Sequence, residues 1–502
     1  MQTLNVNYHD RFTTILCKTI SLFLISAIAS LSIPVSDKKN TSDTENPPQN
    51  IVFILSDDHR YDFMSFHDRA PSYIETPHMD RMAAEGVHLA NAFVTTSLCS
   101  PSRASILTGQ YAHNHHVVDN SSPIPEGTRF FNEDVQQNGY KTAFIGKWHM
   151  GEVDDDPMPG WDRWVSFRGQ GVYYNPVLNV DGERDQYEGY TTDLLTNFAV
   201  EWLEEHKDDP EPFFLYLSHK AVHAEFEPAE RHEGYFADID IEYPATMDNT
   251  VRNYRTKPDW VKAQRYSWHG VDYPYQGDMN FDEFYIAYIE TLLSLDESVG
   301  RVLDYLEETG LAENTIVVYM GDNGFMHGEH GLIDKRNAYE ESMKVPMMAW
   351  APGFIEPDTV VEELVRNIDI APTFLELTNT TSPIDMDGLS FLNLLAGETE
   401  ERDREFLYEY FWEPAFPHTP TTFALRGDQY KYIWYHGVWD RDELYDLHND
   451  PEERYNLSEV PQFRQLRNEM RTRLFEIMEE RNAMSIPLRR AGWQADEKLI
   501  GN

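Results

Sequence analysis

The sequence predicts an α/β fold in which helices cover both faces of a mainly parallel sheet, followed by a smaller C-terminal α+β part. One observation is a set of short apolar, β-branched runs, which is the pattern of fully buried strands. Another is that segments with apolar residues at three- and four-residue spacing lie between these runs, as in amphipathic helices. The strand candidates are residues 51–55, 142–145, 213–217, 315–320 and 346–350, and the helical segments are 193–205 and 284–309.

The pattern changes after residue 400. Residues 423–426, 430–435 and 443–446 are short, aromatic strand candidates near turns, and residues 463–481 have helical spacing. They predict a small antiparallel sheet with a helix. We therefore divide the chain into four parts. These are a signal peptide (1–29), a linker (30–49), a catalytic domain (50–400) that contains a polar, aromatic insertion at 231–282, and a C-terminal subdomain (401–502).

The amino terminus has the layout of a secretory signal peptide. Arg11 and Lys18 precede the apolar stretch 20–27, and Ala27-Ile28-Ala29 is a small-x-small cleavage site. The apolar stretch is too short for a membrane span, which needs about 20 residues. We expect export to the periplasm or the medium without stable membrane insertion; an uncleaved anchor is the alternative.

Composition limits the class of partner. The chain has 41 Lys and Arg against 86 Asp and Glu, a net charge of −45, which argues against binding nucleic acid through a general basic surface. A local cationic pocket can still bind a small anion. The 41% hydrophobic content excludes general disorder, and two cysteines exclude a disulfide scaffold. Removal of the signal peptide would leave Cys99 as the single thiol.

Acidic and amide side chains follow two of the predicted strands. Asp57 and Asp58 come after residues 51–55, and Asp322 and Asn323 come after residues 315–320. Ligands of α/β sheets bind at the carboxyl ends of the strands. Three carboxylates and an amide oxygen suit Ca²⁺ or Mg²⁺ better than zinc. For either pair alone, a solvated loop or a helix N-cap is the alternative.

Cationic side chains are expected near the same rim of the sheet. A tetrahedral oxyanion beside a divalent metal needs such groups to balance its charge. Each one alone is also compatible with a surface charge or a hydrogen-bonded core histidine, and His219 is an alternative to His223. The candidates are Arg103, Lys147, His149, His223 and Lys335.

Cys99 is expected to open a helix. Pro101 lies where a first helical turn accepts proline, and Gly109 lies where a helix ends. A helix N-terminus favours negative charge, which would lower the pKa of the thiol or support an anionic nucleophile at residue 99. A buried inert thiol and a thiol paired with another chain are the alternatives.

The Cys99-Ser-Pro-Ser-Arg103 motif with Gly109 resembles the signature of the type I sulfatases, whose cysteine is oxidised to formylglycine. Residues 146–151 (GKWHMG) resemble the second motif of that family, and 331–342 resemble the segment that carries its substrate-binding lysine. Residues 444–457 are similar to its C-terminal subdomain. The resemblance covers residues 50–460, and the family often has proline where Val222 precedes His223.

The resemblance implies an alkaline-phosphatase-like fold and hydrolysis of sulfate esters by a formylglycine hydrate. It implies maturation of Cys99 by a formylglycine-generating enzyme. One calcium ion would be bound by Asp57, Asp58, Asp322, Asn323 and the modified residue 99.

The resemblance also implies a role for each cationic candidate. Arg103 would steady the hydrate, and Lys147 and Lys335 would hold the sulfate oxygens. His223 would protonate the leaving alcohol, and His149 would deprotonate the second hydroxyl of the hydrate.

The expected substrate is a sulfated carbohydrate, with ulvan as a candidate, because export and the resemblance point to bacterial polysaccharide sulfatases. Aromatic residues of the insertion suit stacking on sugars, although burial in a core is the alternative. The competing functions are a phosphodiester or phosphonate hydrolase of the same superfamily and a non-catalytic protein that binds sulfated glycans. The aromatic residues concerned are Tyr254, Trp260, Tyr266 and Trp268.

Overall fold

The computed structural model describes residues 47–151, 155–277, 279–399, 402–437 and 440–487. The predicted signal peptide and all but the last three residues of the predicted linker lie outside these ranges. Within them, no helix has the length and apolar character needed to span a bilayer. The division of the chain at residue 400 remains a prediction.

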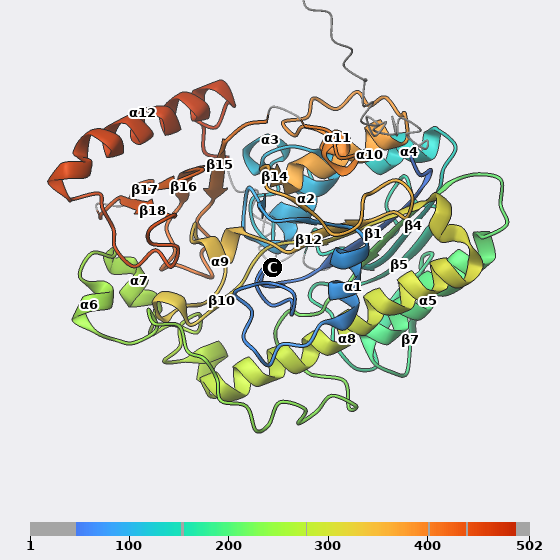
Figure 1. The fold of residues 1–502 in the computed structure, drawn as a ribbon, viewed down its shortest axis with the longest axis horizontal. Coiled ribbons are helices and arrows are strands. Elements are labelled where there is room, and N and C mark those ends of the chain that lie inside the picture. The colour runs from blue at the N-terminus through green and yellow to red at the C-terminus, as the bar shows by residue number, and fades with distance from the viewer. Residues whose placement is uncertain (1–46, 152–154, 278, 400–401, 438–439, 488–502) are drawn as a thin grey trace, which may run out of the picture. The chain divides into compact units, whose positions relative to one another are not determined.

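The centre of the molecule is a ten-stranded sheet with the expected parallel core (Figure 1). Strands β9, β1, β8, β4 and β5 are neighbours in that order and all run parallel. The run at 346–350 forms β12, which pairs antiparallel with β9. The strands in sheet order are β13 (Thr359–Val361), β2 (Val87–Leu89), β12 (Met347–Trp350), β9 (Thr315–Gly321), β1 (Asn50–Ser56), β8 (Phe213–Ser218), β4 (Lys141–Lys147), β5 (Arg163–Phe167), β6 (Val177–Val180) and β7 (Glu183–Gln186).

Helices cover both faces of this sheet, as predicted (Figure 1). On one face lie α1 (Pro77–Glu85), α5 (Thr191–His206) and α8 (Phe281–Thr309). On the other lie α2 (Cys99–Thr108), α4 (Phe131–Gln137) and α10 (Ile370–Leu377). Successive β1 side chains alternate between the faces, so Val52 and Ile54 pack toward α8 while Ile51 and Phe53 pack toward α10. Both faces are therefore apolar, which explains the uninterrupted hydrophobic strand sequences.

A four-stranded antiparallel sheet lies at the C-terminal end, as predicted (Figure 1). It contains β15 (Glu405–Tyr410), β16 (Thr422–Gly427), β17 (Tyr430–Tyr435) and β18 (Glu443–Asp446), with α12 (Arg464–Glu480) packed on one face. Its other face packs against residues of the first part of the chain, including Phe93 and Leu98. This sheet shares its core with the part of the chain that holds Cys99.

The insertion at 231–282 forms α6 (Val251–Tyr254) and α7 (Asp259–Gln264). Tyr254 and Trp260 are buried there in the core beneath the small sheet, so they are packing residues and do not present surfaces to sugars. The shorter elements are β3 (Ala92–Phe93), α3 (Ala112–His115), η1 (Pro274–Gly277), η2 (Leu311–Asn314), β10 (Met326–His327), η3 (Glu329–Gly331), β11 (Ile333–Asp334), α9 (Glu340–Met343), β14 (Val365–Arg366), η4 (Asn367–Asp369), α11 (Leu392–Leu395) and η5 (Pro461–Phe463).

Candidate active site

The carboxyl ends of four parallel strands bring the predicted site residues together. Asp57 and Asp58 follow β1, Asp322 follows β9, Lys147 ends β4, and His223 follows β8. The side chains of the three aspartates and of Lys147 are buried. Because these strands are adjacent and parallel, residues nearly 270 positions apart in the sequence meet at one edge of the sheet.

The three aspartates and Asn323 form a cluster that fits a hard divalent cation. One oxygen from each of Asp57, Asp58 and Asp322 lies within 4.8 Å of the other two. Asp58 Oδ2 and Asn323 Oδ1 are buried without a hydrogen-bond partner. Buried polar atoms normally have partners, and carboxylate and amide oxygens are the donors that Ca²⁺ and Mg²⁺ prefer. These unpartnered oxygens are thus the kind of ligand that such a cation requires.

The charges of the cluster are uneven. Burial is the main cause that raises the pKa of Asp58 to about 7; Lys335 opposes it, and neighbouring Asp57 and Asp322 act in the same direction as burial. Burial also acts on Asp57, but Lys147, His223 and Arg103 outweigh it and hold the pKa of Asp57 well below its usual range. Asp57 is therefore the permanent negative charge of the group.

Arg103 ties this cluster to α2. Its Nε donates to Asp322 Oδ2 at 3.0 Å, and its Nη2 donates to Asp57 Oδ2 at 3.2 Å. Its Nη1 donates to the carbonyl oxygen of Lys147 at 2.7 Å and to Ser218 Oγ at 2.6 Å. With all of its donors directed at the ends of four strands, the buried guanidinium fixes their positions relative to α2.

Two lysines flank Cys99 and the aspartates. Lys147 Nζ donates to Asp57 Oδ2, and Lys335 Nζ donates to Asp58 Oδ1. Lys335 Nζ also lies 3.3 Å from Cys99 Sγ, and that thiol donates to Asp57 Oδ1 at 3.5 Å. The two ammonium groups therefore lie beside residue 99, where they can bind the oxygens of an anion.

Cys99 is the first residue of α2, and Gly109 ends that helix in the left-handed conformation, with φ 67°, as expected. The expectation of a lowered thiol pKa is wrong for the unmodified residue. Burial and, after it, the charge of Asp57 raise the pKa of Cys99 to about 12 against the opposing effects of Lys147 and Lys335. Desolvation and the adjacent carboxylate thus outweigh the helix N-terminus.

The three candidate histidines take different positions. His223 Nε2 lies 3.8 Å from Asp58 Oδ2, and its ring borders the cavity described below. His149 lies beside α2, with Nδ1 3.5 Å from Ser100 Oγ. His219 points away from the cluster, and its Nε2 lies 3.0 Å from Ser298 Oγ on α8. Burial, with Lys147 next, holds the pKa values of His149 and His223 well below the usual range.

A cavity of about 390 Å³ opens beside His223. Asp334 and Arg336, on either side of Lys335, line it together with an aromatic wall. In that wall the rings of Trp268, His269 and Phe416 contact one another, with centroid distances of 5.1 Å from Trp268 to His269, 4.6 Å from His269 to Phe416 and 5.7 Å from Trp268 to Phe416. This volume and mixed lining suit a sugar-sized polar ligand.

Sequence analysis missed several residues that border the site. Lys220 lines the cavity, is 3% exposed, and has its ammonium 4.4 Å from the Tyr173 ring centroid. Gln170 accepts a hydrogen bond from Lys147 Nζ. Asp334 and Arg336 are the sequence neighbours of Lys335, so the motif at residues 331–342 could have identified them. Gln170 lies in no motif, so nothing in the sequence pointed to it.

A family model described as "Sulfatase" matches residues 49–380, which carry Cys99, the acidic cluster and the candidate lysines and histidines. The chain belongs to the sulfatase family. A second model, described as the C-terminal part of N-sulphoglucosamine sulphohydrolase, matches residues 328–480. The family assignment makes the protein a sulfuric ester hydrolase and favours an enzyme over a non-catalytic glycan-binding protein. Sulfatases generally use Ca²⁺ and formylglycine, and the acidic cluster is a possible site for the metal.

Similar proteins include sulfatases that act on sugars. The chain is 31% identical to an N-acetylglucosamine-6-O-sulfatase of Bacteroides thetaiotaomicron over 91% of this chain and 90% of that protein. It is 27% identical to an ulvan-active sulfatase of Formosa agariphila over 90% and 86%. A solved structure of a protein in complex with its substrate D-glucosamine-2-N,6-O-disulfate is 29% identical, covering 89% of this chain and 100% of that one, with a TM-score of 0.77.

Proposed function

We propose that this sulfatase hydrolyses the 6-O-sulfate ester of an N-acetylglucosamine-type residue in a sulfated glycan, with one Ca²⁺ ion and residue 99 as formylglycine. The observation that carries the proposal is the position of Cys99. It begins α2 between the Asp57 carboxylate and the Lys335 ammonium, beside a cluster with two unpartnered oxygens. A formylglycine-generating enzyme would have to act on the chain before it folds, because Cys99 is buried in the folded protein.

Asp57, Asp58, Asp322 and Asn323 are the residues proposed to hold the metal, together with the oxygen of the modified residue 99. The donor set is all oxygen, which suits Ca²⁺. The metal and the formylglycine hydrate together would supply a hydroxyl group acidic enough to act as a nucleophile near neutral pH.

The protein side chains would then bind the sulfate and move the protons. Lys147 and Lys335 would hold the sulfate oxygens, because their ammonium groups flank residue 99. Arg103 would keep residue 99 and the strand ends aligned through its bonds to Asp57 and Asp322. Neither lysine would need to move far, since both are already buried at the site.

His223 is the group proposed to give a proton to the leaving alcohol. It borders the cavity in which the sugar would lie, whereas His219 is directed toward α8. His149, whose ring lies next to Ser100, is proposed to accept the proton released when residue 99 expels sulfate. The two histidines would therefore act at different steps and on different oxygens.

The substrate class is supported by the cavity and by the relatives. The aromatic wall containing Trp268 suits the face of a sugar ring, and Asp334 and Arg336 can hydrogen-bond its hydroxyls. N-acetylglucosamine 6-sulfate is the first substrate to test because the 31% identical relative, matched over most of both chains, has that name. An ulvan-type substrate is the second candidate, supported by the 27% identical relative.

A phosphonate or phosphodiester hydrolase remains the competing activity. The solved phosphonate monoester hydrolase of Agrobacterium radiobacter has a TM-score of 0.72 but 20% identity, a likeness of fold alone.

Export is a further part of the proposal, with residues 1–29 as signal peptide and 401–502 as C-terminal subdomain. Relatives named extracellular sulfatases support export.

The test begins with peptide mass spectrometry across residue 99 in protein made with a formylglycine-generating enzyme. Conversion of cysteine to formylglycine lowers the mass by about 18 Da. The modified protein is then assayed on N-acetylglucosamine 6-sulfate, on ulvan oligosaccharides and on the matched 6-phosphate. We expect kcat/KM to be highest on the first.

Variants identify the residues responsible. Cys99→Ala should abolish turnover, and Lys335→Met should lower kcat/KM by about 10²–10³-fold, as expected for loss of a group that stabilises developing charge. Lys207→Met, at an exposed surface ion pair, is the matched control. An unmodified residue 99 with full sulfatase activity, or a higher kcat/KM on the phosphate, would contradict the proposal.

A further inference from the structure

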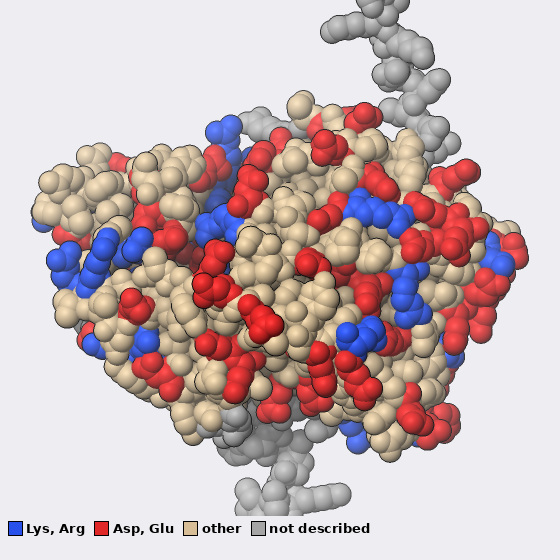
Figure 2. Space-filling model, turned by 60° about the horizontal axis from the view of Figure 1, so that its bottom comes forward, with Lys and Arg blue, Asp and Glu red and all other residues tan. Residues whose placement is uncertain are grey.

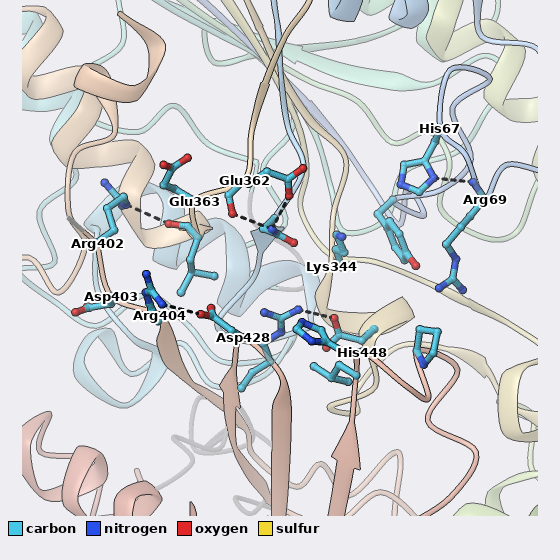
Figure 3. A pocket seen from close by; sticks show the side chains of 17 residues that line it. His67, Arg69, Lys344, Glu362, Glu363, Arg402, Asp403, Arg404, Asp428 and His448 are labelled. Carbon is cyan, nitrogen blue, oxygen red and sulfur yellow. Dashed lines mark hydrogen bonds and ion pairs between the residues drawn. The ribbon is translucent and has the colours of Figure 1, made fainter. Parts of the chain in front are cut away.

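A second cavity, larger than the first, lies between the loops of the large sheet and the small antiparallel sheet (Figure 3). We call it the lateral cleft; its volume is about 860 Å³. None of the proposed catalytic or metal-binding residues lines it. The residues used below are Tyr61, His67, Arg69, Lys344 and Arg426.

Lys344 is a cation without a matching anion. Its ammonium lies 4.9 Å from the ring centroid of Tyr61 and 5.9 Å from that of Phe93. It forms no ion pair with any residue in the described part of the chain. The nearby carboxylate of Glu340 is already shared by Arg426 at 3.2 Å and Lys431 at 3.0 Å.

Other positive groups surround Lys344. Arg426 lies 4.4 Å from the Phe93 ring centroid, on which Lys344 also borders. Arg69 approaches carboxylates no closer than 3.8 Å, and 39% of its side chain is exposed. Burial lowers the pKa of Lys344, and Arg426 and Arg69 lower it further against the effects of Glu340 and Asp62. Arg426 is itself paired with Glu340, so Lys344 is the cation of this group that has no ion pair within the described residues.

The charges of the cleft are unevenly distributed. Lys344, His67 and Arg69 lie on one side of the view in Figure 3, which we call the basic side. The carboxylates Glu363 and Asp403 lie on the other side, together with Arg402 and Arg404. Over the face shown in Figure 2, acidic side chains are spread widely and Lys and Arg gather in separate clusters. In a chain of net charge −45, a lysine without an ion pair that lies beside Arg69 in a cleft suits an anionic ligand.

We propose that the basic side of the lateral cleft binds an anionic group of the glycan chain, a sulfate ester or a uronate carboxylate, outside the active site. This inference rests on the proposed glycan substrate. A cleft of this volume can hold more than one sugar ring. Both the loops of the large sheet and β16 contribute cations to it, so a bound chain contacts both parts of the fold.

The substitution that tests the site is Lys344→Gln, which removes the unpaired charge and keeps most of the side chain. Lys207→Gln is the control, since Lys207 is a surface lysine outside the cleft. The probes are dextran sulfate, polygalacturonate and uncharged dextran, with affinity measured by electrophoresis in gels that contain each polymer. Activity is measured in parallel as kcat/KM on N-acetylglucosamine 6-sulfate.

We expect Lys344→Gln to weaken binding of at least one charged polymer about tenfold, the contribution of one charge-assisted hydrogen bond. A loss on dextran sulfate alone identifies a sulfate group, and a loss on polygalacturonate alone identifies a carboxylate. Binding to uncharged dextran and kcat/KM on the monosaccharide should not change. Thermal stability should be equal or higher, because an uncompensated partly buried charge has been removed.

The inference is overturned if Lys344→Gln binds both charged polymers as the wild type and Lys207→Gln do. It is also overturned if kcat/KM on the monosaccharide falls as far as polymer affinity, since Lys344 would then act through α9 on the active site. Loss of polymer binding in a protein that turns over none of the sulfate esters would support the cleft and refute the proposed function.

Discussion

Removal and return of calcium should change the thermal stability of the protein. Asp58 Oδ2 and Asn323 Oδ1 are buried without partners, and three carboxylates share a small volume. A ligand that binds only the folded state at 100 times its Kd stabilises it by about 2.7 kcal/mol. The unfolding entropy of about 2.1 cal/mol/K per residue gives about 0.9 kcal/mol/K for the roughly 430 described residues. The expected rise in Tm is therefore about 3 °C.

The assay is scanning calorimetry of protein stripped with a chelator and then titrated with CaCl₂. Asp58→Asn should reduce the calcium-dependent shift, because it removes one charged ligand from the proposed site. Asp208→Asn, at an exposed position, should leave the shift unchanged. If the wild type shows no shift, or if Asp58→Asn keeps the full shift, the cluster does not hold the metal.

Two further predictions concern the scaffold. Gly146 has φ 126°, and a Cβ there would lie 1.7 Å from the carbonyl oxygen of Ser218. Gly146→Ala should therefore lower the free energy of unfolding, measured in urea, by at least about 4 kcal/mol. Gly139→Ala, with φ 98° and open space, is the control and should cost about 1–3 kcal/mol. Equal losses of unfolding free energy in Gly146→Ala and Gly139→Ala would contradict the predicted clash with Ser218. Burial raises the pKa of Asp296 to about 7 in the folded protein. The protonated carboxyl therefore contributes its full stabilisation only below the pKa that Asp296 has in the unfolded chain. This stabilisation is lost as the pH rises to about 7. Asp296→Asn should therefore gain stability relative to the wild type by up to about 4 kcal/mol between about pH 4 and pH 7, and a pH-independent difference would contradict this.

The sequence predicted the central strands closely because each is buried on both faces. The predicted strands 51–55 and 315–320 correspond to β1 (Asn50–Ser56) and β9 (Thr315–Gly321), and no predicted end differs from the observed end by more than one residue. Strand β15 was missed, although its residues alternate between the two cores of the small sheet. The three-residue strands β2 and β13, at one end of the large sheet, are too short to show a period. Their pairing depends on contacts far away in the sequence.

The site was predictable in composition but not in electrostatics. The motif around Cys99 and the two acidic pairs identified the residues that meet at the sheet edge. The raised pKa of the Cys99 thiol depends on Asp57, 42 positions away, and on complete burial. No local pattern contains that information. The same holds for Lys220, whose place beside the cavity depends on how the chain leaves β8.

The arrangement of charges links the proposed metal to the proposed anion site. Lys147 and Lys335 now neutralise Asp57 and Asp58, the same carboxylates that are proposed as metal ligands. An oxygen that binds a divalent cation has less negative charge to offer an ammonium group. Calcium binding would therefore weaken both ion pairs and leave two buried ammonium groups beside residue 99 in need of a new anion. A sulfate ester can provide that anion, so metal loading and substrate affinity should increase together, even in a protein whose overall charge repels anions.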